Sequence, residues 1–117
     1  MYQRHELGQI GEELAALYLE RNGYKIIERN FRYKKYEIDI IAKYNKELVF
    51  IEVKTRSNKI YGRPIEAVNN IKQKHIQKAT KYYLYINRKE NAYVRLDVIE
   101  VYFYKNKYYI NHIKQII

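Results

Sequence analysis

The sequence predicts an α+β fold, a mixed α/β domain in the broad sense, that spans residues 1–117 as a single domain. Three observations predict it. Two long segments place apolar residues at helical spacing, and several shorter segments rich in Ile, Val and Tyr are typical of strands. A length of 117 residues suits one compact domain with its own core. The chain has no Cys, which excludes disulfide scaffolds and Cys-ligated zinc folds.

The first helix is expected over residues 7–22, followed by Gly23 as a C-terminal stop. Its apolar face is formed by Leu7, Ile10, Leu14, Leu17 and Tyr18. A second stripe of small residues lies beside that face and contains Gly8, Gly11 and Ala15. Such a stripe permits close approach of another backbone. Glu12 borders the stripe; it is either a solvated helix residue or a group presented to a neighbouring site.

The remaining elements follow in the order strand, strand, strand, helix, strand, strand. Strands are expected over 24–31, 37–43, 47–54, 93–103 and 108–114, with a basic turn at 32–35 and a polar loop at 55–63. The second helix is expected over 65–86, with Pro64 at its start. The polar loop directly follows Lys54, so it is a natural place for a mobile substrate clamp.

Net charge points to an anionic partner. The chain carries 23 Lys and Arg against 13 Asp and Glu, a net charge of +10. An acidic segment, 37–52, lies between the basic segments 25–36 and 53–89. Nucleic acid is the usual partner of such a charge, although a composition rich in Lys, Ile and Asn could also raise it by drift. No apolar run is long enough to span a bilayer and the start lacks a signal-peptide core, so a cytoplasmic protein without a membrane partner is expected.

The strongest chemical pattern lies in the hairpin of residues 37–54. If Asn45 and Lys46 form a two-residue turn, Asp39 faces Glu52 and Glu37 faces Lys54. Facing side chains have Cβ atoms about 5 Å apart, so two carboxylates would converge at a cost that a divalent cation would remove. Mg²⁺ or Mn²⁺ would be held by Asp39, Glu52 and the carbonyl of Val53, with Lys54 as the catalytic cation. The alternative is an exposed edge hairpin with a Glu37–Lys54 ion pair and solvated Asp39 and Glu52.

A set of basic side chains is expected to contact nucleic acid. Lys74, Lys78 and Lys81 recur on one side of the second helix, and Lys72 lies on another side from which it could reach the carboxylates. The full set is Lys34, Lys35, Arg56, Lys59, Arg63, Lys72, Lys74, Lys78 and Lys81. Asp97, inside an apolar strand, is expected to be structural, with Arg95 or a loop amide as its partner.

Several short motifs are spread over most of the chain. They are Gly8-x-x-Gly11-Glu12, Gly23-Tyr24, Arg29-Asn30, Glu37-Ile38-Asp39, Phe50-Ile51-Glu52-Val53-Lys54-x-Arg56, Gly62-x-Pro64 and Arg95-x-Asp97. Between Gly8 and Tyr102 the chain thereby resembles the uncharacterised bacterial YraN-like family. That family is similar to the archaeal Holliday-junction resolvases and to the restriction-endonuclease-like PD-(D/E)xK nucleases. The family usually has Gly before Glu-Ile-Asp, where this chain has Tyr36, which bears on substrate fit.

The resemblance implies a restriction-endonuclease-like αβββαβ core, with a central mixed sheet flanked by helices. It makes Asp39, Glu52 and Lys54 the catalytic triad and Glu12 a helix-borne contributor to the same metal site. The expected function is therefore a metal-dependent endonuclease acting on DNA, with branched or structured DNA as the candidate substrate. Resolvase-like action on a two-fold junction would call for a homodimer. The alternative is a non-catalytic nucleic-acid-binding module on the same fold. A basic RNA- or ribosome-associated protein with structural carboxylates is a third, more remote reading.

Overall fold

A computed structural model describes residues 4–57 and 70–117 of the chain. Its elements are α1 (Arg4–Arg21), β1 (Lys25–Tyr33), β2 (Tyr36–Tyr44), β3 (Glu47–Ser57), α3 (Asn70–Ile86), β4 (Tyr93–Tyr104) and β5 (Lys107–Ile113). This is the predicted α+β fold with the predicted order of elements. The expected helix start near Pro64 lies outside the described residues.

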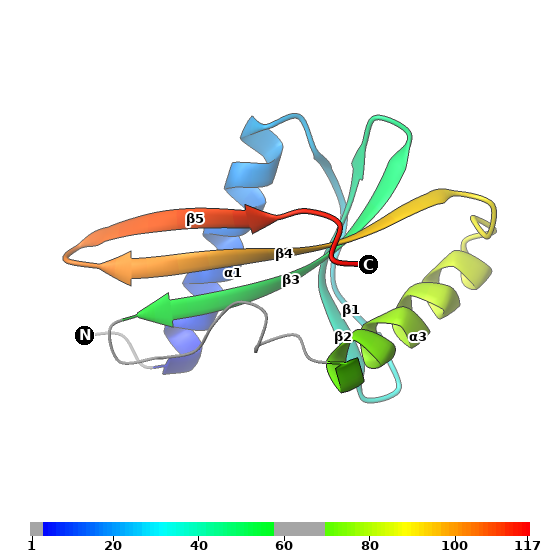
Figure 1. The fold of residues 1–117 in the computed structure, drawn as a ribbon, viewed down its shortest axis with the longest axis horizontal. Helices are drawn as coiled ribbons and strands as arrows, with labels where there is room; N and C mark the ends of the chain where they lie inside the picture. The colour runs from blue at the N-terminus through cyan, green and yellow to red at the C-terminus, as the bar shows by residue number, and fades with distance from the viewer. Residues whose placement is uncertain (1–3, 58–69) are drawn as a thin grey trace.

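The five strands form one mixed sheet in the order β1-β2-β3-β4-β5. All neighbouring pairs are antiparallel except β3 and β4, which run parallel. Tight turns connect the antiparallel pairs, and Lys34 (φ 58°) and Asn45 (φ 54°) adopt the left-handed conformation that such turns need. The sheet is strongly twisted, so that β1 and β2 cross the direction of β3, β4 and β5 in Figure 1.

Helices α1 and α3 cover opposite faces of the sheet. Alternate residues of β3 enter different cores: Val49, Ile51 and Val53 pack with Ala15 and Leu19 of α1. Their neighbour Phe50 packs against Ile76 and Tyr83 of α3. Figure 1 shows α1 passing behind β3 to β5, while α3 lies at the other end of the molecule beside β1 and β2. Because both faces are covered, β3 and β4 are buried almost continuously over their central residues.

Two predicted boundaries between a strand and the segment after it were wrong by a few residues. Thr55 and Arg56 belong to β3 rather than to a loop, because they continue the parallel pairing with Val101 and Tyr102 of β4. Tyr33 belongs to β1, where it pairs with Tyr36, so the basic turn shortens to Lys34 and Lys35. No helix in the described part of the chain is long and apolar enough to span a membrane.

A buried polar network joins β4 to β5 and to Tyr24, the residue that precedes β1. Asp97, which is fully buried, accepts two hydrogen bonds from the Arg95 guanidinium at 2.9 Å and is 2.6 Å from His112 Nε2. Arg95 also donates to the Tyr24 hydroxyl. Burial acts against the charged form, but these hydrogen bonds hold the pKa of Asp97 below its usual value. The expected pairing of Asp97 with Arg95 is confirmed.

Candidate functional site

The candidate site lies where the central hairpin forks. The β2–β3 ladder runs from Tyr44 opposite Glu47 to Ile40 opposite Ile51, in the predicted register. It ends there. Beyond Ile40, β2 continues to pair with β1, while β3 continues to pair with β4 along its whole length. Asp39 and Glu52 occupy the next positions in each strand, so both carboxylates lie at the fork.

Asp39 takes the place of a backbone partner at the fork. Its Oδ2 accepts a hydrogen bond from the Val53 N–H at 2.8 Å, and the residue is only 9% exposed. In an extended strand the N–H and C=O of one residue point to the same edge. The carbonyl of Val53 therefore lies on the edge of β3 that faces Asp39, as its predicted role as a ligand requires.

The carboxyl of Asp39 is held in an unfavourable electrostatic environment. Burial and, next, repulsion from Glu52 raise the pKa of Asp39 to about 8, against the lowering effect of the Val53 hydrogen bond. Glu12 and Glu37 add smaller repulsions. Negative charge thus converges on this point from three elements, α1, β2 and β3. A cation bound there would relieve a cost that the fold retains.

Glu52 is buried and faces two ammonium groups. It is 5% exposed, and its Oε1 lies 3.4 Å from Lys54 Nζ and 3.3 Å from Lys72 Nζ. Burial opposes the charged form of Lys72, but attraction and hydrogen bonding to Glu52 outweigh it and raise the pKa of Lys72. Lys72 belongs to α3, so this helix adds a group to the fork, as its position in the sequence suggested.

Glu12 reaches the same region from the opposite face of the sheet. A methyl group on Gly11 would overlap Thr55 Oγ1, so α1 packs closely on β3 only because residue 11 is a glycine. Gly8, the other glycine of the predicted stripe, has open space around it. Burial and repulsion from Glu37 raise the pKa of Glu12, with Arg29 acting in the opposite direction.

The donor set at the fork fits a hard cation that keeps part of its water. No three His, Cys, Asp or Glu side chains in residues 4–57 and 70–117 lie close enough together to form a metal cluster. The donors brought together are the Asp39 and Glu52 carboxylates and the Val53 carbonyl, all oxygen, which is what Mg²⁺ uses beside water and phosphate. Direct ligation by Glu12 stays a prediction.

Two predictions about this hairpin are wrong: the facing of Glu37 and Lys54, which followed from the predicted register, and the solvent exposure of Asp39 and Glu52, which the alternative required. Glu37 does not face Lys54, because the β2–β3 ladder has ended before it; Glu37 instead pairs with Arg32 of β1 at 2.8 Å. Asp39 and Glu52 are buried near the middle of the sheet rather than solvated on an edge hairpin. Their convergence therefore has no explanation in solvent exposure.

An open cavity lies on the α1 side of the sheet, and among the described residues its lining includes neither Asp39 nor Glu52. Its volume is about 790 Å³, and it lies between α1 and the β1–β2 ribbon. Glu12 and Glu37 line it together with Arg29 and Arg32. Arg29 binds Glu13 at 2.7 Å but keeps a buried Nε that has no hydrogen-bond partner within the described residues. The cavity thus offers both carboxylates and arginines to an incoming group.

The predicted basic residues divide into three groups. Lys34 and Lys35 lie on the exposed β1–β2 turn, and Lys74, Lys78 and Lys81 are exposed on α3. Arg56 is half-buried in β3, and its Nε finds no hydrogen-bond partner among the residues described. Lys59 and Arg63 lie outside the described residues. Between these lysines lies a group of aromatic rings that the sequence did not predict, formed by Tyr33, Tyr36, Tyr82 and His75.

These observations define a class of protein: an α+β domain with paired carboxylates and lysines at a fork in a mixed sheet. The chain belongs to the uncharacterised protein family UPF0102, whose model matches residues 11–101. This confirms the YraN-like resemblance.

Relatives across bacteria match most of the chain. It is similar to a UPF0102 protein of Alkaliphilus oremlandii, with 47% identity over 111 residues that cover 93% of this chain and 95% of the relative. A UPF0102 protein of Chlorobium phaeobacteroides is 52% identical over 97 residues, covering 83% and 76%. One from Geobacter metallireducens is 49% identical over 107 residues, covering 92% and 88%.

Proposed function

We propose that this protein is a metal-dependent endonuclease that cleaves DNA, with branched or otherwise structured DNA as the preferred substrate. The observation that supports it most directly is the pair of buried carboxylates, Asp39 and Glu52, that converge at the fork beside Lys54. A fold that buries two facing carboxylates gives up stability, which a bound cation and a phosphodiester would account for. The family resemblance implies the same triad.

Each group has a chemical task in this proposal. Asp39, Glu52 and the Val53 carbonyl would hold Mg²⁺ or Mn²⁺, which when bound supplies Lewis-acid stabilisation of charge on the phosphate. The Lys54 ammonium would donate hydrogen bonds to phosphate oxygens and stabilise negative charge that develops during cleavage. Lys72 would balance Glu52 while the substrate is absent. Glu12 would act from the α1 side, either on a bound water or as an additional ligand.

A second candidate is a nucleic-acid-binding module that does not cleave. It is favoured by one observation: Lys54 and Lys72 already balance the charge of Glu52 without a metal ion. If these ion pairs are permanent, the carboxylates are structural and the basic surface alone contacts nucleic acid. Both candidates predict salt-dependent binding, and only the first predicts metal-dependent turnover.

A cleavage assay with matched variants separates the candidates. Linear, flapped and four-way DNA are incubated with the parent across a titration of Mg²⁺ or Mn²⁺. Asp39→Asn should bind DNA as well as the parent in metal-free buffer at pH 7, because the raised pKa of Asp39 leaves that carboxyl mostly protonated there, and it should lose cleavage, because a neutral amide is a poor ligand for Mg²⁺. Lys54→Ala should bind slightly more weakly and also lose cleavage, through lost stabilisation of the transition state. Glu20→Gln and Lys43→Ala, exposed residues away from the fork, are the charge-matched controls and should behave as the parent.

The outcomes are distinct. Metal-dependent cleavage by the parent and controls, but not by the two variants, supports the nuclease. Salt-dependent binding without cleavage of any DNA or RNA supports the binding module. Cleavage that survives Asp39→Asn at the parental rate would refute the proposed site.

A further inference from the structure

A second groove lies between α3 and the β1–β2 turn, and it shares no lining residue with the α1 cavity. It has a volume of about 480 Å³ and is formed where the β1–β2 turn meets the outer face of α3. Its lining, which we call the tyrosine–lysine groove, consists of Tyr33, Lys34, Tyr36, Lys78, Lys81, Tyr82 and Tyr85. Four aromatic rings and three ammonium groups line it, and the lining includes no carboxylate.

The rings of this groove are held in place by contacts between the hairpin and the helix. Tyr33 of β1 stacks on Tyr82 of α3, with ring centroids 4.4 Å apart and planes at 24°. Tyr36 of β2 stacks on His75 of α3 in the same way, at 4.4 Å and 27°. These rings are therefore ordered before any ligand arrives, which lowers the entropy cost of binding. Tyr82 and Tyr85 remain 38% and 68% exposed, so ring surface is available to a ligand.

The lysines surround this aromatic floor. Lys34 Nζ lies 5.3 Å from the centroid of the Tyr33 ring, and Lys78 Nζ lies 5.9 Å from that of Tyr36. Lys81 lines the groove from the same side of α3. A ligand that satisfies both features must present a flat aromatic group and a negative charge close to it. An acidic peptide supplies the charge and carries a ring only where an aromatic residue adjoins an acidic one, whereas every nucleotide of a single strand supplies both.

We propose that the tyrosine–lysine groove binds an unpaired nucleotide of single-stranded nucleic acid. The base stacks on the exposed faces of Tyr82 and Tyr85, and the adjoining phosphates contact Lys34, Lys78 and Lys81. A base inside a duplex cannot stack in this way, so the groove distinguishes unpaired from paired strands. The proposal depends on the proposed function for its class of ligand, nucleic acid, and is independent of cleavage.

The groove adjoins the candidate site along β2. Tyr36, which lines the groove, lies three positions before Asp39 in β2, a distance of about 10 Å along the strand at the usual rise. A strand end held in the groove would thus direct the neighbouring phosphodiesters toward the fork. The preferred substrate of the proposed nuclease is then DNA in which single and double strands meet, as in flaps, overhangs and junctions.

Binding in metal-free buffer tests the groove separately from catalysis. Probes are a 12-residue oligo-dT, the matching oligo-U, and a blunt duplex of the same length, with binding followed by fluorescence anisotropy at low salt. The parent should bind the single strands more tightly than the duplex. Tyr82→Ala and Tyr85→Ala should each weaken single-strand binding by about tenfold, within the range of one lost base–aromatic stack. Duplex binding should change by less than about twofold.

Controls exclude general effects. Tyr108→Ala removes another exposed tyrosine, on β5, and should leave all binding unchanged. Tyr82→Phe keeps the ring and should bind single strands as the parent does, whereas replacement of Lys78 and Lys81 with Ala should reduce the salt slope of single-strand binding. Circular dichroism verifies that each variant is folded. The dT and U probes report whether the groove accepts DNA, RNA or both.

Two results would each overturn the proposal. In the first, Tyr82→Ala and Tyr85→Ala bind single strands as tightly as Tyr108→Ala does. In the second, the parent shows no preference for single strands over the duplex. The same proteins are then given Mg²⁺ and structured DNA. If structured DNA is cleaved but the groove does not bind single strands, only the groove proposal is refuted. If the groove binds single strands but no DNA is cleaved, only the nuclease proposal is refuted.

Discussion

The raised pKa of Asp39 predicts that this carboxyl lowers the stability of the protein as pH rises. In the native state its pKa is about 8, because of burial and then repulsion from Glu52, whereas in the unfolded chain it is close to 4. Between these two values the native state retains a proton that the unfolded state has lost. Stability therefore falls with rising pH across this window and becomes level above about pH 8.

Asp39→Asn removes this titration and little else. The amide has nearly the shape of the protonated carboxyl, and its oxygen still accepts the hydrogen bond from the Val53 N–H. One proton corresponds to about 1.4 kcal/mol per pH unit, so the variant should gain roughly 3–4 kcal/mol over the parent between pH 5 and pH 8. This is a large share of the 5–15 kcal/mol typical of a domain.

Urea unfolding in metal-free buffer at pH 5, 6, 7 and 8 measures the effect. Only the difference between variant and parent is used, because other titrating groups then cancel. A difference in the free energy of unfolding that grows by about 1.4 kcal/mol per pH unit supports the argument. The same difference at pH 5 and pH 8 would show that Asp39 is already ionised in the native state, and the reasoning on the fork would fail.

Three further predictions concern other features of the structure. Gly11→Ala should destabilise the protein by about 1–2 kcal/mol, as overpacking against Thr55 exceeds the gain in helix propensity, and Thr55→Ala should restore most of the loss. Gly8→Ala, in open space, should instead stabilise by up to about 1 kcal/mol in the same urea titrations. Arg95→Met should cost about 3–5 kcal/mol at pH 7, since it leaves Asp97 buried without its cation, and chemical denaturation should show the loss shrinking below pH 4 as that carboxyl is protonated. Mg²⁺ should raise the melting temperature of the parent more at pH 8 than at pH 6, because binding must displace a proton at the fork, and an equal rise at both pH values would contradict this.

The sequence predicted the hairpin register because one local feature decides it. Asn45 accepts a left-handed conformation, so a two-residue turn sets Tyr44 opposite Glu47, and the pairs as far as Ile40 opposite Ile51 follow. Lys72 was placed near the carboxylates by helical geometry alone. These inferences needed only the periodicity of single elements.

The fork itself could not be predicted. A regular ladder would have continued to Glu37 and Lys54, but β2 changes its pairing to β1 alone near Asp39. Asn30 of β1, with φ 54°, lies between the residues that pair with Ile40 and Ile38 and marks the same irregularity. Which strand leaves a ladder depends on helix packing and sheet twist, and neither is encoded in the spacing of a few residues.

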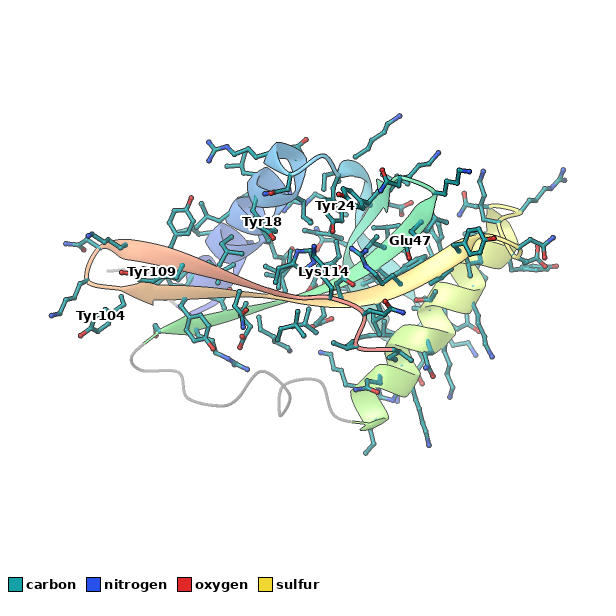
Figure 2. All side chains as sticks on the ribbon, turned by 45° about the horizontal axis from the view of Figure 1, so that its top comes forward. Tyr18, Tyr24, Glu47, Tyr104, Tyr109 and Lys114 are labelled. Carbon is teal, nitrogen blue, oxygen red and sulfur yellow. The ribbon has the colours of Figure 1, made fainter. Side chains whose placement is uncertain are left out.

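The surface aromatics were underestimated for a different reason. With 15 Tyr in the chain, no single tyrosine stood out in the sequence. Which tyrosines lie together depends on the folded structure. Figure 2 shows Tyr104 and Tyr109 at the outer end of the β4–β5 hairpin, far from α3. Tyr33 of β1 and Tyr82 of α3, by contrast, stack on each other. Only packing distinguishes a cluster from scattered residues.

The parallel pairing of β3 with β4 has a consequence for how the chain acquires its structure. The β1–β2–β3 meander needs only tight turns, so it can form within microseconds of synthesis, and it already brings Asp39 and Glu52 together. Glu47 pairs with Tyr93, however, so β3 keeps an open, apolar edge until α3 and β4 have been made and β4 has paired with it. During that interval the nascent chain exposes a strand ready to pair with other chains. Glu52 and Lys54, the charged side chains near the middle of that strand, make it a poorer template for pairing than an all-apolar strand would be.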